Sequence, residues 1–436
     1  MSGDLRKGWC PGVLQPMAAA DGLIVRVRPT GGILPAATAR AIADLAARYG
    51  NGKLDLTARA NLQMRGVRDA SLPALVDALR SLGLVDCEAA AEAVRNVVAS
   101  PLAGLHDGPD IRPLVAALEA RLVEVTALHA LPTKFGFLID DGSAPSLADV
   151  AADVRFDWRG DAFAIGLGGT RDAALPAGVC GAGELVACAE DIARRALALF
   201  ARMPEATRMR ALIERLDLTG EGADLLLPLA GEGGLAKRGR MRGGAASLPT
   251  PAEADTSLFP SPGRERRDAA LTLAAPYGRL EAAMLHVAAA LAARAGGELR
   301  LTPWRSLLLP GLPPDDAAAR RTARAAGFIV DPDDPRLRVA ACVGAPECAR
   351  ATTATRADAD ALAAFAAALG AKSADGQSLH VSGCAKGCAR AAAARATLVG
   401  RDGRYDLVVD GRAGDPPKLR GLDLAAARAA LAELAA

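Results

Sequence analysis

Four cysteines near the end of the sequence have the spacing of metal ligands. Cys342 and Cys348 are separated by five residues, and Cys384 and Cys388 by three. A [4Fe–4S] cluster needs four thiolates at such loop sites, because each thiolate binds one iron and offsets part of its charge. Two other interpretations stay open. One is a structural zinc site, although its cysteine pairs usually enclose about two to four residues. The other is a set of unrelated buried thiols, which behave as small hydrophobic groups.

Glycines accompany these cysteines where the backbone would have to come close to a cluster. Gly344, Gly383 and Gly387 lack a side chain, so their N–H groups could approach the sulfides and tune the reduction potential. The other cysteines have no paired ligand spacing, and we interpret them as ordinary thiols: Cys10, Cys87, Cys180 and Cys188. Among them Cys10 stands out, because its Trp-Cys-Pro-Gly segment is typical of a turn.

An internal repeat forms the frame that must position these residues. Residues 52–67 align without gaps on residues 297–312, with Gly, Leu, Leu, Thr, Leu and Gly at identical offsets. A strand-like alternation precedes each copy, at 23–28 and at 271–275. An alanine-rich helical stretch then follows in each unit, at 36–49 and at 280–295. Each unit therefore predicts strand, helix and strand, and the whole chain predicts a mixed α and β fold.

Residues 231–268, between the two units, have the composition of a linker or long loop. They are rich in Gly, Pro, Ser and Arg and lack apolar periodicity. A basic lid is the alternative, because cations cluster in this stretch: Lys237, Arg238, Arg240, Arg242, Arg264, Arg266 and Arg267.

The composition of the 436 residues argues against nucleic-acid and membrane partners. The net charge is +2, so the chain lacks a global basic field, and an aromatic content of 3% offers few stacking platforms for bases. The sequence shows no apolar run of about 18 residues and no apolar segment of the secretory type at its start. We therefore expect a cytoplasmic protein whose cysteines are reduced or metal-bound.

Over essentially its whole length the chain resembles the sulfite/nitrite reductase superfamily, in which such cysteine pairs hold a [4Fe–4S] cluster beside a sirohaem. Residues 56–66 resemble its T-x-R-x-N/T-x-Q segment, residues 95–104 its R-N-V/I segment, and residues 131–135 its L-P-R-K-F segment. The resemblance implies an α+β fold with a duplicated sulfite/nitrite-reductase-like architecture, ferredoxin-like half-repeats and a C-terminal Fe–S cluster domain.

That architecture divides the chain into five parts. We expect a first ferredoxin-like half-repeat at residues 1–90, a middle reductase-like α/β domain at 91–230 and the linker at 231–268. A second half-repeat at 269–336 and the [4Fe–4S] cluster domain at 337–436 follow.

Within the superfamily the chain is most similar to the precorrin-3B synthase family of the aerobic cobalamin pathway. Residues 8–12, 21–28, 55–63 and 380–388 carry this similarity, and Trp304 also fits that branch. The similarity implies an oxygen-dependent monooxygenase that converts precorrin-3A to precorrin-3B by hydroxylation at C20 and γ-lactone formation. A tetrapyrrole substrate, dioxygen and an external electron donor would be its partners.

A precorrin carries many acetate and propionate carboxylates, and burying them requires cations. Under this resemblance we expect the substrate-binding residues on the first strand, in the first repeat and in the two family segments beyond it: Arg26, Arg28, Arg59, Asn61, Gln63, Arg65, Arg95 and Lys134. A solvated surface charge is the alternative for each cation. Structural hydrogen bonding is the alternative for Asn61 and Gln63.

A mononuclear non-haem iron is also associated with this family, but the sequence does not identify its ligands. The chain has four histidines, none of them in the His-x-Asp/Glu pattern of a facial triad: His106, His129, His286 and His380. His380 lies four residues before Cys384, which makes it the histidine of most interest.

Two rival functions would use the same cysteines. A sirohaem-dependent assimilatory sulfite or nitrite reductase would keep a tetrapyrrole as a permanent cofactor, with Cys388 bridging the cluster to the sirohaem iron. Against it, Gly136 stands where the reductases place a second lysine, two residues after the one that Lys134 matches. A non-enzymatic Fe–S or zinc scaffold is the third interpretation, and the match over the whole repeat weighs against it.

Overall fold

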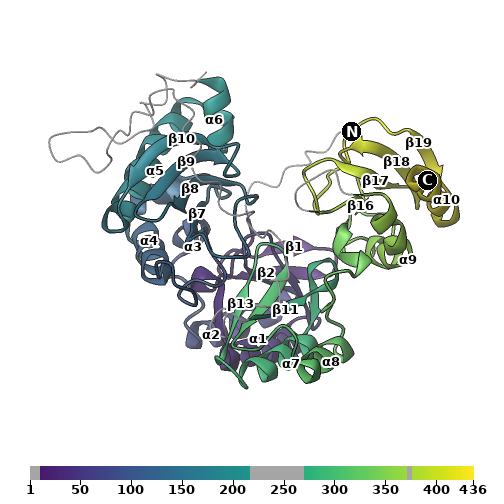
Figure 1. Cartoon of the computed structure of the whole chain (residues 1–436), viewed down its shortest axis with the longest axis horizontal. Helices are drawn as coiled ribbons and strands as arrows, with labels where there is room; N and C mark the ends of the chain where they lie inside the picture. The colour runs from purple at the N-terminus through teal and green to yellow at the C-terminus, as the bar shows by residue number, and fades with distance from the viewer. Residues whose placement is uncertain (1–9, 217–269, 371–375) are drawn as a thin grey trace.

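The computed structural model describes residues 10–216, 270–370 and 376–436, so the predicted linker at 231–268 and its basic cluster lie outside the described residues. The described chain forms three lobes (Figure 1). A central lobe contains both copies of the repeat, and an outer lobe follows each copy in sequence. In the part of the chain that the structure describes, no helix combines the length and apolar character needed to cross a membrane.

Two antiparallel sheets form the central lobe, one for each copy of the repeat. The first sheet has the strand order β1 (Met17–Ala19), β2 (Gly22–Val27), β5 (Leu62–Val67), β4 (Lys53–Leu56) and β12 (Arg279–Glu281). The second has the order β11 (Ala270–Ala274), β14 (Ser306–Pro310), β13 (Glu298–Leu301) and β3 (Ile33–Pro35). Each sheet ends on a short strand from the other copy, because β12 pairs with β4 and β3 pairs with β13.

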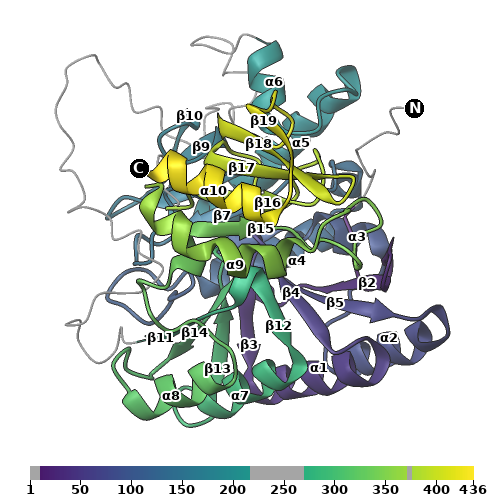
Figure 2. The same cartoon turned by 90° about the vertical axis from the view of Figure 1, so that its right-hand side faces the viewer.

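Four helices cover one face of these sheets: α1 (Ala36–Tyr49), α2 (Leu72–Ser81), α7 (Ala282–Ala292) and α8 (Ala317–Ala325). Figure 2 shows them along the bottom of the lobe, with the strands above. Apolar residues of both sheets and of these helices share one core. The predicted helix at 36–49 is confirmed, and the one at 280–295 begins later because its first residues form β12.

The repeated segment differs from the single strand that its sequence predicts. Residues 52–67 form two strands, β4 and β5, which are joined by a turn in which Ala60 has a φ of 52°. The second copy turns at the matching place, where Arg305 has a φ of 59°. A left-handed conformation at a residue other than glycine is uncommon, so this turn leaves little signal in the sequence.

Each outer lobe contains a five-stranded mixed sheet. The first has the strand order β10 (Leu175–Cys180), β9 (Phe163–Gly169), β8 (Ala152–Trp158), β7 (Phe137–Asp140) and β6 (Val97–Ala99), with helices α3 (Ala89–Val94), α4 (Arg112–Glu124), α5 (Leu185–Arg202) and α6 (Met209–Arg215). The second has the order β15 (Val339–Ala341), β16 (Leu379–Ser382), β17 (Ala394–Arg401), β18 (Arg404–Gly411) and β19 (Leu419–Leu422), with helices α9 (Thr355–Ala368) and α10 (Leu424–Ala435). Since β15 and β16 are parallel, the loops at their carboxyl ends meet at one edge of the sheet.

Candidate functional site

A strip of polar side chains crosses the first central sheet. Because side chains alternate along a strand, β2, β4 and β5 bury apolar residues toward the helices and present polar residues on the other face. Four of the polar residues lie side by side on adjacent strands, in the order Arg26, Gln63, Asp55 and Arg279. In the amide orientation that satisfies both groups, the Gln63 carbonyl oxygen accepts from Arg26 Nη2 at 2.8 Å. Asp55 Oδ1 accepts from Arg279 Nε at 2.8 Å.

The two cysteine pairs meet at the edge of the second outer lobe. Cys342 directly follows β15, and Cys384 lies two residues beyond β16. The backbone N–H of Gly383 donates to Cys342 Sγ at 3.1 Å, which ties the two loops together. Burial raises the pKa of the Cys388 thiol, and the other three cysteines of the set add to this rise. The parallel strands therefore gather all four predicted ligands in one place.

A cavity of about 350 Å³ lies between the polar strip and the cysteine loops. Four of the predicted substrate-binding residues line it: Arg26, Arg59, Gln63 and Lys134. Cys342 and Cys388 also line it. Arg59 Nη2 donates to the Lys134 carbonyl oxygen at 2.7 Å, so the turn of the first repeat contacts the first outer lobe at this cavity.

Arg28 and Arg95, two of the expected substrate-binding residues, are not among the residues that line this cavity. Arg28 Nη1 donates to Glu92 Oε1 at 2.8 Å, and these two side chains are only 2% and 4% exposed. Arg95 contacts Asp86 and Glu119, each at 2.9 Å. Because these carboxylates already neutralise and hydrogen-bond the guanidinium groups, the two arginines join segments of this chain.

Arg65 and Asn61 also lie outside the cavity wall. Arg65 donates to Asp21 with Nη2 at 2.7 Å and approaches Asp55 with Nη1 at 3.4 Å. Asn61 is buried in the hairpin turn, where its backbone N–H donates to Thr57 Oγ1 at 3.2 Å. These contacts hold the strip and the turn in place.

Five ionisable residues of the cavity wall are absent from the sequence prediction: Cys10, Asp55, Tyr277, Arg305 and Arg356. Alternation along β4 is the signal that could have placed Asp55. Tyr277 and Arg305 come from the second copy of the repeat, and Arg356 from the first turn of α9, so only the fold brings them here. Arg356 Nη2 donates to Asp55 at 3.0 Å, whereas its Nε and Nη1 have no hydrogen-bond partner among the described residues. Arg356 therefore lies at the cavity wall with two buried donors that have no partner among the described residues.

The thiol of Cys10 differs from the ordinary thiol that the sequence suggests. Burial by itself would raise the pKa of this thiol, but the charges of Arg26, Arg59 and Lys134 outweigh burial, and the pKa is lowered. A thiol that ionises more readily than usual therefore lies in the same cavity as the arginines.

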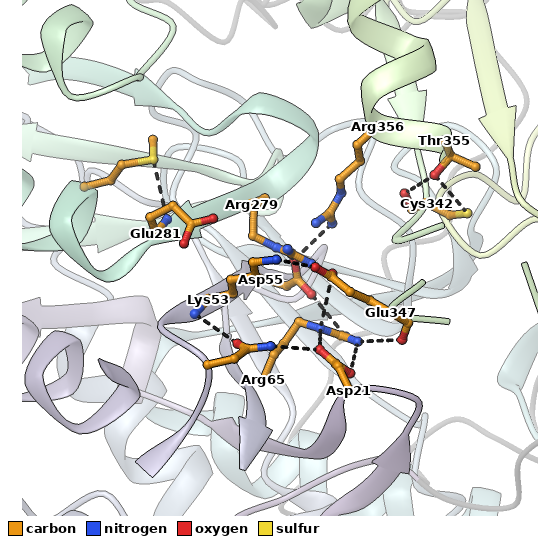
Figure 3. A network of polar contacts seen from close by, with 12 residues as sticks. Asp21, Lys53, Asp55, Arg65, Arg279, Glu281, Cys342, Glu347, Thr355 and Arg356 are labelled. Atoms are coloured by element: carbon orange, nitrogen blue, oxygen red, sulfur yellow. Dashed lines mark hydrogen bonds and ion pairs between the residues drawn. The ribbon is translucent and has the colours of Figure 1, made fainter. Parts of the chain in front are cut away.

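A network of ion pairs joins the polar strip to the first cysteine loop (Figure 3). Glu347, which lies inside that loop, accepts from Arg279 Nη2 at 2.8 Å and forms an ion pair with Lys53. The Glu347 carbonyl oxygen accepts from Arg65 Nη2 at 3.2 Å. Through these contacts the central sheet holds a loop that carries two predicted cluster ligands.

Two carboxylates balance the arginines of this network. Burial raises the pKa of the Asp55 carboxyl, but Arg356 and Arg279 lower it to about 2. Burial likewise raises the pKa of Glu347, and the hydrogen bonds from Arg279 and Lys53 lower it to about 2. Both groups are therefore ionised at neutral pH.

The cysteine loops fit a [4Fe–4S] cluster in two respects. The two loops pack closely against each other, since a Cβ built at Gly383 would lie 2.5 Å from Ala351 Cβ. His380, which is 0% exposed, lies beside the second loop, and neither ring nitrogen has a hydrogen-bond partner among the described residues. Burial lowers the pKa of His380 to about 4, and the charges of Arg390 and Arg305 add to this effect. An unpartnered buried polar group needs an explanation, and a cofactor held by the neighbouring loops provides one.

A single metal ion fits less well. Among the described residues, no three His, Cys, Asp or Glu side chains converge closely enough to hold one ion. A cluster of four irons binds each thiolate at a different iron, so it does not require three side chains to converge on one ion. The expected mononuclear iron likewise has no set of three protein ligands in the described part of the chain, and we derive no step through it.

Known proteins share this architecture. A family model of the nitrite/sulfite reductase ferredoxin-like half domain matches residues 15–82 and 263–321, the two ranges that contain the repeat. The structure of the Mycobacterium tuberculosis NirA protein is similar with a TM-score of 0.67 and 21% identity, over 92% of this chain and 77% of that chain. The expected duplicated α+β architecture with ferredoxin-like half domains is thereby confirmed.

Similarity in sequence extends over very different lengths in two relatives. A precorrin-3B synthase from a Sinorhizobium species is 34% identical over 95% of this chain and 85% of its own length. A ferredoxin–nitrite reductase from Synechococcus elongatus is 32% identical over 30% of this chain and 27% of its own length. The first relative matches nearly the whole chain, and the second matches less than a third of it.

Proposed function

This chain belongs to the precorrin-3B synthase family, within the nitrite/sulfite reductase superfamily, and we propose that it is the oxygen-dependent monooxygenase that converts precorrin-3A to precorrin-3B. In the proposed reaction one atom of dioxygen enters at C20. The other leaves as water, which takes two electrons and two protons from an external donor. The ring A acetate then closes a γ-lactone. The observation that carries the proposal is a cavity where cations from several lobes face the loops with the cysteine pairs.

The cations of the cavity can bind the carboxylates of a tetrapyrrole. Arg26, Arg59 and Lys134 come from the first half of the chain, whereas Arg305 and Arg356 come from the second. Arginine pairs with carboxylates through two parallel hydrogen bonds, and four of the five cations in the cavity wall are arginines. Cations on opposite walls would fix the orientation of the macrocycle and therefore the position of C20.

We propose that Cys342, Cys348, Cys384 and Cys388 hold a [4Fe–4S] cluster, which supplies electrons one at a time when it is bound. Because Cys342 and Cys388 line the cavity, the cluster ligands and the substrate-binding residues share one wall. Glu347 and its ion pairs keep the first cysteine loop against the central sheet.

The first test is the absorption spectrum of the anaerobically purified chain, together with iron and sulfide assays. We expect a broad sulfide-to-iron band, about four irons and four sulfides per chain, and no sirohaem bands. Substitution of Cys384 or Cys388 by Ser should abolish the cluster. A chain that keeps its iron and sulfide after these substitutions would refute the ligand assignment.

The reaction that the chain catalyses distinguishes the proposed monooxygenase from a sirohaem-dependent reductase. We expect the cluster-bearing chain to convert precorrin-3A to precorrin-3B when given dioxygen and a chemical reductant, with the product identified by mass spectrometry and ¹⁸O₂ incorporation. The similarity to ferredoxin–nitrite reductases favours sirohaem-dependent sulfite or nitrite reduction as the second candidate. Sirohaem bands at about one tetrapyrrole per chain, with reduction of sulfite or nitrite, would replace our proposal by that one.

A further inference from the structure

A buried imidazole beside the second cysteine loop has no protein partner that the structure describes. His380 is 0% exposed, and both of its ring nitrogens lack a hydrogen-bond partner among the described residues. An imidazole carries at least one N–H at any pH, so a donor is always left over at this place. Buried polar groups are nearly always paired, and the exceptions call for an acceptor outside the polypeptide.

The strand on which His380 lies determines the direction of its side chain. Leu379 and Val381 of β16 pack into the core of the second outer lobe, so His380 and Ser382 face the other side of the sheet. That side carries the loop of Cys384 and Cys388, because Ser382 Oγ donates to the Cys384 carbonyl oxygen at 2.8 Å.

The loop approaches the ring closely at one glycine. A Cβ built at Gly387 would lie 3.6 Å from His380 Cε1, and Gly387 has a φ of 61°, a conformation that favours glycine. Gly387 directly precedes Cys388, so a side chain at this position of the loop would be in van der Waals contact with the ring. The imidazole therefore lies on the side of the sheet that carries the second cysteine loop.

We infer that His380 donates its ring N–H to a sulfur of the [4Fe–4S] cluster, either a sulfide or a cysteine thiolate, and thereby raises the reduction potential of the cluster. The inference rests on the cluster assignment of the proposed function. A hydrogen bond to sulfur stabilises the reduced cluster, which carries more negative charge, over the oxidised one. His380 is in this sense a positioning and tuning residue, and it does not touch the substrate cavity.

The experiment uses the full chain with its cluster, labelled with histidine that carries ¹⁵N in the ring. The chain has only four histidines, so labelling is selective. His106 and His129 belong to the first outer lobe and His286 to α7, away from the cysteine loops. We expect pulsed EPR of the reduced cluster to detect a ¹⁵N hyperfine coupling in the unsubstituted chain. In His380→Gln the coupling should disappear. An absent coupling in a chain that contains its four irons and four sulfides would overturn the inference and leave the proposed function intact.

The midpoint potential gives a second, independent readout. His380→Leu removes the donor and should shift the potential of the cluster to a more negative value, whereas His380→Gln keeps an N–H donor and should shift it less. Thr397→Val is the matched control, because Thr397 is the neighbour of His380 on β17 and its hydroxyl donates to the Gly411 carbonyl oxygen. An unchanged potential in His380→Leu would refute the tuning role. An unsubstituted chain without iron and sulfide would refute the cluster assignment, and the inference with it.

Discussion

The arginines of this chain have different roles, and the partners of each guanidinium group determine its role. Arg26 and Arg59 lie in the cavity wall, while Arg28 and Arg95 are each paired with carboxylates away from it.

The surroundings of Gly136 leave little space for a side chain. A side chain there would meet backbone, since a Cβ would lie 3.3 Å from the Asn96 carbonyl oxygen. The position that carries a second lysine in the reductases is therefore crowded here.

Substituting Arg59 and Arg95 should separate binding from stability. Arg59→Ala removes a cation from the cavity and should weaken precorrin-3A binding about 10- to 100-fold, because a charge-assisted hydrogen bond contributes about 1.5–3 kcal/mol. Its melting temperature should change little. Arg95→Ala leaves Asp86 and Glu119 without their cation and should lower the melting temperature. Absorbance titration and thermal unfolding measure the two effects. The reverse pattern would show that Arg95 is the substrate residue.

The ion pair of Arg28 and Glu92 offers a test of stability at a buried site. Among the described residues, Arg28→Met would leave the Glu92 carboxylate with only the backbone N–H groups of Val13 and Leu14 as donors. An unpaired buried charge typically costs about 3–5 kcal/mol, and because these two donors remain we expect a loss of about 3 kcal/mol. Adding Glu92→Gln should recover part of the loss. Urea unfolding measures the free energy, and equal stability of Arg28→Met and the unsubstituted chain would contradict this account.

Two regular features of the β-strands place the residues of the site. Alternation along β2, β4 and β5 puts the polar strip on one face of the sheet, and the parallel arrangement of β15 and β16 brings the cysteine loops to one edge. Asp55 connects the polar strip to the lobe that carries the cysteine loops, because it contacts Arg279 of β12 and Arg356 of α9.

The depressed pKa of Asp55 predicts a specific dependence of stability on pH. In the folded chain its pKa is about 2, against an ordinary value of 3.8. The unfolded chain therefore takes up a proton first as the pH falls. The stabilisation of about 2 kcal/mol is complete above about pH 5 and is lost as the pH falls through 3.8 toward about 2.

Asp55→Asn should remove this contribution. Urea unfolding between about pH 5 and about pH 3 should give a shallower decline of the free energy of unfolding in the variant than in the unsubstituted chain. Asp77→Asn, whose side chain is 76% exposed, serves as the control and should keep the full slope. Parallel profiles for Asp55→Asn and the unsubstituted chain would refute the assigned role of this carboxylate.

The whole molecule is built from two halves that complete each other. The sheet of the first copy ends on β12 from the second, and the sheet of the second ends on β3 from the first. Apolar residues of both copies share one core. A separated half would expose unpaired strand edges and part of that core.

Cutting the chain within the linker tests this dependence. Residues 1–245 and 246–436 expressed separately should fail to give a cooperative unfolding transition, whereas co-expression should restore one folded complex that binds the cluster. Circular dichroism with thermal unfolding and gel filtration would measure both results. A half that unfolds cooperatively on its own would contradict the shared core.

The two copies of the repeat differ in the space that each leaves for a ligand. Arg300 is the counterpart of Asp55 in the repeat, is 1% exposed, and donates to the carbonyl oxygens of Pro101 and Ala103 at 3.3 and 3.4 Å. The space beside it is only about 20 Å³. The first copy therefore faces the open cavity, and in the second copy Arg300 and the segment of Pro101 and Ala103 leave little space at the equivalent place.

The repeat, the helix at 36–49 and the two cysteine pairs can be read from the sequence, because periodicity and ligand spacing are local properties of the chain. The sequence also contained the similarity on which the family assignment rests. The folded chain was needed to show that Arg59 lines the cavity and Arg95 does not, and that Arg305 and Arg356 belong to the cavity wall. Arg95 is held outside the cavity because carboxylates from two other segments, Asp86 and Glu119, occupy its guanidinium group. The packing of segments far apart in the sequence decides where such pairing occurs.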